Sequence, residues 1–157
     1  MRRALAIGVL VLLAAALAWL RDPAWLATQT TGMREWRQAP DGQRWRWTAG
    51  HASFFVPSDA SAFRISMATS FDPLEWLGDR PMLVTVTIDD RRAARLVLSQ
   101  PGWQVATVAL PPRGNRRVRR VDLRTSVTRP GNRGVQIGEP EVTTDGQNWR
   151  RCCFSER

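Results

Sequence analysis

The sequence predicts an all-β fold, a jelly-roll-like β-sandwich of about eight strands preceded by one N-terminal transmembrane helix. From residue 44 onward, apolar and polar residues alternate over short runs that Gly, Pro and Asn separate. No amphipathic helix pattern follows residue 20, and one uninterrupted apolar run precedes it. A length of 157 residues suits one compact domain with its own core.

The N-terminal segment has the composition of a membrane anchor. Residues 4–20 carry no charged or strongly polar side chain and follow the basic pair Arg2-Arg3. As a helix these 17 residues rise about 25 Å, close to the thickness of a hydrocarbon core. The basic end should stay in the cytoplasm, so we expect a single-pass protein of the bacterial inner membrane with its domain on the periplasmic side. The anchor residues are Ala4, Leu10, Leu13, Leu17, Trp19 and Leu20.

A cleaved signal peptide is the alternative for the same segment. Ala16-Leu17-Ala18 has the small-x-small form of a signal-peptidase site behind an apolar core. Both alternatives export the domain, and a mature chain that starts at Trp19 would exclude the permanent anchor.

The strands predicted by alternation lie within a single domain. Beyond the anchor or signal peptide (1–20), we expect a juxtamembrane segment (21–43), the β-sandwich (44–145) and a C-terminal tail (146–157). Turn residues such as Pro101-Gly102 and Pro130-Gly131 separate the strands. The predicted strands are 44–48, 52–56, 63–67, 82–88, 93–98, 103–110, 118–127 and 134–143.

The two cysteines are adjacent and close to the end of the chain. Cys152 and Cys153 could bond to each other only through a strained ring, so they provide no disulfide framework. We expect two thiols on a frayed tail, with a disulfide to a partner in an oxidising compartment as the alternative.

Three segments carry a resemblance to known proteins. They read Trp-Thr-Ala-Gly-His-Ala-Ser-Phe-Phe-Val-Pro over 47–57, Val-Thr-Ile-Asp-Asp-Arg over 86–91 and Arg-Pro-Gly-Asn-Arg-Gly-Val-Gln-Ile-Gly-Glu over 129–139. The chain resembles an uncharacterised family of bacterial membrane-anchored domains over about residues 21–143. These domains are similar to the sugar-binding-like β-sandwich modules at the C-termini of some integral-membrane glycosyltransferases. The resemblance implies a jelly-roll fold and an envelope setting, and no catalytic residue.

The basic residues gather in one stretch of the sequence. The net charge is +9, and all 23 basic residues are Arg. Residues 113–133 hold eight Arg and one acid, Asp122, and strand alternation directs Arg120, Asp122 and Arg124 to one face. A solvated strand face is the ordinary explanation, and anionic headgroups, an acidic protein partner or an acidic glycan are the alternatives. Nucleic acid is not expected beyond an exporting anchor. The candidate ligand-binding arginines are Arg116, Arg117, Arg119, Arg120 and Arg124.

Tryptophan supplies the other candidate site, because indole faces stack on sugar rings. Trp76, in the loop 71–80, and Trp103 are the candidate ligand-binding aromatics. Trp45 and Trp47 share one face of a predicted strand, where burial is the simpler explanation.

Catalytic and metal-binding patterns are sparse. The single His, His51, has no evident partner, and no nucleophile elbow, phosphate-binding loop or His/Cys metal pattern occurs. Glu139 and Glu141 are spaced as a same-face pair on a strand, and solvation explains them more simply than glycosidase chemistry. We expect no enzyme and no cofactor. A structural Ca²⁺ bound by the loop acids is a weaker alternative; these acids are Asp72, Glu75 and Asp79.

Two functions remain open from the sequence. The first is a non-catalytic, membrane-tethered module that binds envelope glycan or assists glycosyl transfer. The second is an interaction module that docks on a membrane complex or an anionic membrane surface through its Arg-rich face.

Overall fold

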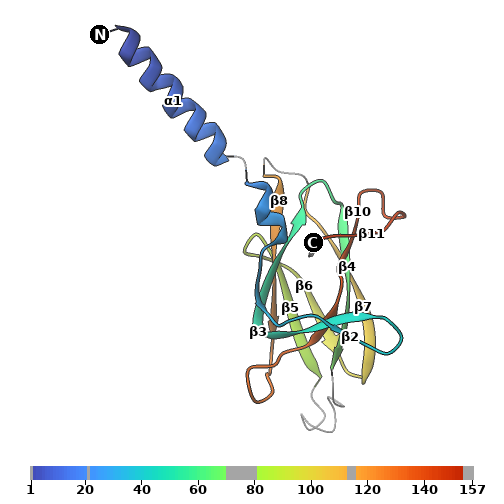
Figure 1. Cartoon of the computed structure of the whole chain (residues 1–157). Coiled ribbons are helices and arrows are strands. Elements are labelled where there is room, and N and C mark those ends of the chain that lie inside the picture. The colour runs from blue at the N-terminus through green and yellow to red at the C-terminus, as the bar shows by residue number, and fades with distance from the viewer. Residues whose placement is uncertain (1, 21, 70–80, 113–115, 154–157) are drawn as a thin grey trace.

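The computed structural model of the chain describes residues 2–20, 22–69, 81–112 and 116–153. Figure 1 shows a two-layered β structure with one helix, α1 (Arg2–Leu20), projecting from one end. A short 3-10 helix, η1 (Ala24–Thr28), follows α1. Among the described residues, none of the helical segments combines the length and hydropathy that a membrane-spanning helix requires. The mostly β architecture is confirmed, and the membrane span stays a prediction.

The described part of the chain forms eleven strands, more than the eight predicted. The predicted strands 44–48 and 52–56 are one continuous strand, β3, and 134–143 is divided into β9 and β10. The short strands β1, β2 and β11 were not predicted. The bounds are β1 (Thr30–Met33), β2 (Arg37–Gln38), β3 (Arg44–Pro57), β4 (Ala62–Thr69), β5 (Met82–Ile88), β6 (Arg91–Leu98), β7 (Gly102–Ala109), β8 (Val118–Thr125), β9 (Gln136–Gly138), β10 (Glu141–Thr143) and β11 (Arg150–Arg151).

Two local features explain these differences. A Cβ atom on Gly50 would lie 2.7 Å from Thr128 Cγ2, so this glycine lets the segment after β8 pack closely against β3. The chain continues through Gly50 without a turn between the predicted strands 44–48 and 52–56. Pro140 separates β9 from β10, because proline has no N–H to donate to a sheet.

Strand β3 belongs to both layers and joins them. Its first half pairs with β9, where Trp45 lies opposite Gly138, and its second half pairs with β8, where Phe54 lies opposite Val121. The β8 layer contains β1, the second half of β3, β8, β5 and β6. The β4 layer contains β2, the first half of β3, β9, β4 and β7, with β10 beside β4 and β11 beside β10.

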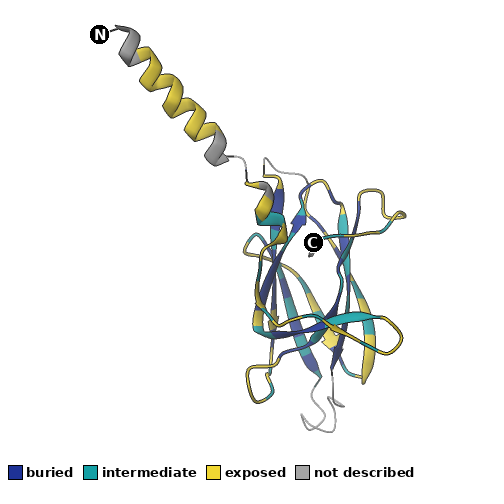
Figure 2. Cartoon of the chain, in the orientation of Figure 1, coloured by how far each residue is buried: buried dark blue, intermediate teal, exposed yellow. Residues whose placement is uncertain are grey.

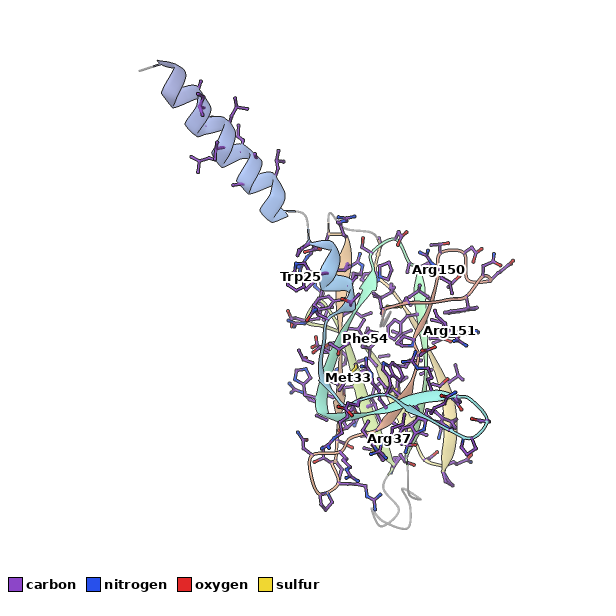
Figure 3. The ribbon with its side chains drawn as sticks, in the orientation of Figure 1. Trp25, Met33, Arg37, Phe54, Arg150 and Arg151 are labelled. Atoms are coloured by element: carbon purple, nitrogen blue, oxygen red, sulfur yellow. A yellow bond between two sulfur atoms is a disulfide. The ribbon has the colours of Figure 1, made fainter. Side chains whose placement is uncertain are left out.

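The core lies between these layers, as the inward positions of the strands in Figure 2 show. Phe54 of β3 and Phe63 of β4 are fully buried, and their rings meet edge to face with centroids 5.9 Å apart. Figure 3 shows Phe54 pointing into the interior. Because inward and outward positions alternate, every second residue of the β8 layer is left on an outer surface.

The cysteine expectation was wrong. Cys152 and Cys153 form a disulfide with each other, with their Cα atoms 3.7 Å apart. Both pack against the core, and the Cys152 N–H donates to the Pro140 carbonyl at 3.1 Å. The segment before them is not a frayed tail, because β11 pairs with β10.

Candidate functional site

An open groove lies on the outer surface of the β8 layer and is called the β8 groove below. Its volume is about 450 Å³. The side chains come from the strands β3, β5, β6 and β8 and from the turn between β5 and β6. The lining residues are His51, Thr85, Thr87, Asp90, Arg92, Arg120, Asp122 and Arg124.

Strand register arranges the floor of the groove in two rows. In the first row, Arg95, Thr85, Arg124 and His51 are successive partners across β6, β5, β8 and β3. In the second row, the successive partners are Arg92, Thr87, Asp122 and Ser53. Paired residues of antiparallel strands share a face, so these side chains lie side by side on the outer surface.

Asp122 is the centre of the hydrogen-bond network in the groove. Its Oδ1 accepts a hydrogen bond from Ser53 Oγ at 2.7 Å and lies 3.2 Å from His51 Nε2. Its Oδ2 accepts a hydrogen bond from Arg120 Nε at 2.9 Å. Burial raises the pKa of Asp122, but the hydrogen bonds from Ser53, Arg120 and His51 outweigh burial and lower that pKa below its ordinary value. His51 therefore has a partner, which the sequence did not reveal.

Acidic residues from a distant turn neutralise part of the basic stretch. Asp89 and Asp90 connect β5 to β6, and both have positive φ angles, 48° and 67°, as in a tight two-residue hairpin. Arg119 Nη1 donates to Asp89 Oδ2 at 3.0 Å, and Arg120 Nη2 donates to Asp90. The net positive charge around this end of β8 is therefore smaller than the Arg count along the sequence suggests.

Three arginines beside the groove have no ion-pair partner among the residues that the structure describes. Arg92, Arg95 and Arg124 have no acidic partner within the described ranges. A second hollow of about 240 Å³ adjoins the groove, because it shares Thr85, Arg92 and Arg124 with it and adds Arg95. Sequence analysis singled out Arg124 but missed Arg92 and Arg95, which precede it on another strand. Their exposed, alternating positions on β6 were the available signal.

The segment after α1 is fixed to the start of β8. Asp22 accepts a hydrogen bond from Arg116 Nη2 at 2.9 Å and another from the backbone N–H of Arg117 at 3.1 Å. The Arg116 hydrogen bond lowers the pKa of Asp22, against the opposing effect of burial. Arg116 is thus a partner of the N-terminal segment, while the Arg117 side chain is exposed.

The tryptophan candidates lie apart from the β8 groove or outside the described residues. Trp103 is 39% exposed on β7, in the other layer, where it pairs with Ala68. Trp76 falls within residues 70–80, outside the described residues. Trp47 is buried and Trp45 is half-buried, in edge-to-face contact with ring centroids 6.0 Å apart, as burial predicts.

The carboxylate candidates are engaged elsewhere. Arg44 and Arg151 each form an ion pair with Glu139, and Arg64 forms one with Glu141. No group of three or more His, Cys, Asp or Glu side chains suited to a metal occurs in the described part of the chain. Asp72, Glu75 and Asp79, the calcium candidates, lie outside it.

Comparison with known proteins finds only distant structural likenesses. No protein-family model and no curated protein matches the chain. A sugar-binding protein, the EclA C-terminal domain, is similar with 14% identity and a TM-score of 0.48, over 69% of this chain and 90% of that domain.

Two further solved structures are similar over smaller shares of their own lengths. The salicylyl-acyltransferase SsfX3 of a tetracycline biosynthetic pathway has 12% identity and a TM-score of 0.47, over 74% of this chain and 37% of SsfX3. A Clostridium perfringens ZmpB fragment with an M60 catalytic domain and two CBM51 domains has 11% identity and a TM-score of 0.42, over 74% of this chain and 14% of the fragment. Because these identities and TM-scores are low, the function is proposed from the β8 groove and not from these similarities.

Proposed function

We propose that this protein is a non-catalytic glycan-binding module held at the periplasmic face of the bacterial inner membrane. The observation that carries the proposal is the β8 groove, an open hollow of about 450 Å³ on the outer surface of a sheet. Its walls offer hydroxyl, carboxylate, imidazole and guanidinium groups on adjacent strands. A sugar ring presents several hydroxyl groups that both donate and accept hydrogen bonds, and this mixture of partners matches them.

Rigid support of the polar groups favours binding. Asp122 is held by Ser53, Arg120 and His51, and the lining strands are hydrogen-bonded on both sides except at β6. A preorganised site loses little conformational freedom when a ligand binds. The resemblance of the sequence to sugar-binding-like modules of glycosyltransferases agrees with this role.

The geometry around His51 argues against a nucleophilic enzyme. The Ser53 hydroxyl donates to Asp122 at 2.7 Å, so its proton is directed to a carboxylate and not to the imidazole. In a serine hydrolase the imidazole accepts the proton of the nucleophile, and the carboxylate orients that imidazole. We therefore assign the Ser53, His51 and Asp122 group to positioning of the groove.

Two features support the proposed membrane tether, namely the apolar N-terminal segment and its junction with the domain. Residues 4–20 supply the apolar length, and Asp22 is already hydrogen-bonded to the start of β8. Trp25, on η1, is 61% exposed beside the foot of α1, as Figure 3 shows, a position that suits a membrane interface. This short junction would keep the domain close to the bilayer.

Binding by the full chain in a neutral detergent tests the proposal. Titration against a panel of envelope polysaccharides should give saturable binding. Thr87→Val keeps the β-branched shape but removes a groove hydroxyl, so binding should weaken about tenfold. Thr107→Val is the matched control, because Thr107 is exposed on β7 of the other layer. Absence of saturable binding, or equal loss in the two variants, would refute the proposal.

A further inference from the structure

The two ends of the β8 groove differ in charge. Asp90 and Asp122 lie at the end nearer the β5–β6 turn, where both accept hydrogen bonds from Arg120. Arg95 and Arg124 flank Thr85 one row farther from that turn, and Arg92, which lies in the row of Asp122, lines the adjoining hollow with them. None of these three arginines has an acidic partner in the described part of the chain. The groove and its adjoining hollow therefore hold four arginines against two aspartates, and a single arginine engages both aspartates.

From this asymmetry we infer that the groove recognises the anionic group of an acidic sugar, a carboxylate or sulfate held among Arg92, Arg95 and Arg124. The inference rests on the proposed function and names its ligand class. Arg95 and Arg124 are both partners of Thr85, so their Cα atoms lie two strand spacings apart, about 10 Å. Long side chains at that separation can converge on one anion, and a planar guanidinium suits bidentate contact with a carboxylate or sulfate.

Mutual repulsion makes the empty arrangement unfavourable and a bound anion favourable. Three like charges, two on β6 and one on β8 across the intervening β5, repel one another, whereas an anion between them attracts all three. The Thr85 hydroxyl at the centre can donate a further hydrogen bond. Elsewhere on β8 the chain supplies acids to Arg119 and Arg120, and among the described residues it supplies none to Arg124.

Position along β8 favours a glycan over membrane headgroups. Asp22 accepts a hydrogen bond from the backbone at the start of β8, so this end of the domain adjoins α1 (Figure 1). Arg124 lies six residues beyond Val118, about 20 Å along the strand. That distance exceeds the screening length of about 8–10 Å at moderate ionic strength, so Arg124 would be remote from headgroups near the junction.

A pair of oligosaccharides that differ only in charge tests the inference. The full chain in a neutral detergent is titrated with an oligogalacturonate and with the same oligosaccharide after reduction of its carboxylates to primary alcohols. The acidic form should bind at least tenfold more tightly, and inorganic sulfate should compete with it. The preference should decline as ionic strength rises.

Matched arginine variants locate the effect. Arg92→Gln, Arg95→Gln and Arg124→Gln should each weaken binding of the acidic oligosaccharide about tenfold and weaken binding of the reduced oligosaccharide much less. Arg117→Gln is the control, because it removes the same charge from an exposed residue at the other end of the stretch. All four positions are exposed, so the variants should fold, which circular dichroism checks.

Other results would overturn the inference in distinguishable ways. Equal binding of both oligosaccharides, weakened by Thr87→Val, would leave the proposed function standing and remove the anionic ligand. Binding of neither oligosaccharide would remove the inference, and absence of binding to the polysaccharide panel as well would remove the proposed function. Equal weakening by Arg117→Gln and Arg124→Gln would mean that overall charge attracts the ligand. Binding to phosphatidylglycerol but not phosphatidylcholine vesicles, lost in Arg117→Gln, would assign the basic surface to headgroups.

Discussion

Arg120 Nε donates a hydrogen bond to Asp122 Oδ2 at 2.9 Å, across two residues of the same strand. Both side chains lie on the outer face of β8, where alternation places them together. Their pairing balances charge at the end of the β8 groove nearer the β5–β6 turn and leaves Arg124, the next residue on that face, without an acidic partner within the described ranges. The polarity of the groove follows from this relationship.

Removal of the Asp122 charge should destabilise the fold in a pH-dependent way. At about pH 7, Asp122→Asn should lower the free energy of unfolding by about 1–3 kcal/mol, because Ser53 and Arg120 lose a charged acceptor. The folded-state pKa of Asp122 lies below its ordinary value of 3.8, so its stabilisation is present above that value. As pH falls through the folded-state pKa, the stabilisation is lost. Urea unfolding should therefore show the gap between the wild type and the variant narrowing in acid. A gap of constant size would contradict the network.

Loss of the Asp22 carboxylate should loosen the start of β8. Asp22→Ala removes the acceptor for Arg116 and for the Arg117 backbone N–H. Trypsin should then cut after Arg116 and Arg117 about tenfold faster, since local opening becomes easier. Mass spectrometry of the fragments measures these rates. Glu35→Ala, at an exposed position, is the control, and equal rates in both variants would show that Asp22 does not hold the junction.

The disulfide can be checked by counting thiols. Protein purified without reductant and then unfolded should show no reactive thiol, because Cys152 and Cys153 are bonded to each other. Reduction before unfolding should expose both. A chain that shows two thiols without reductant would contradict the bond. A covalent dimer that reductant converts to monomer would instead indicate a disulfide between two chains.

Local pattern was sufficient to predict most of the longer strands and the faces of β8. The strict alternation around Val121 and Leu123 predicted that Arg120, Asp122 and Arg124 would share a surface, which is confirmed. The continuous β3 was missed, because Gly50 has the composition of a turn and its close neighbour Thr128 is distant in sequence. The short strand β11 has too few residues to show any periodicity.

The residues that line the groove could not be predicted from the sequence, because they depend on which strands are neighbours. Asp89 and Asp90 are about 30 residues from the arginines that they neutralise, and only the pairing of β5 with β8 brings them together. A charge count along the sequence therefore overstated the basic surface near Arg119. It also gave no reason to associate Arg92 and Arg95 with Arg124.

Mapping the ligand contact by NMR would show whether the glycan binds in the β8 groove. The isotope-labelled full chain in neutral detergent is titrated with the acidic oligosaccharide while backbone amide shifts are followed. We expect the largest shift changes on β8, β5 and the facing part of β3, centred on Thr85 and Asp122. Changes centred on Trp103 of β7, or on Arg116 and Arg117 beside the junction, would contradict it.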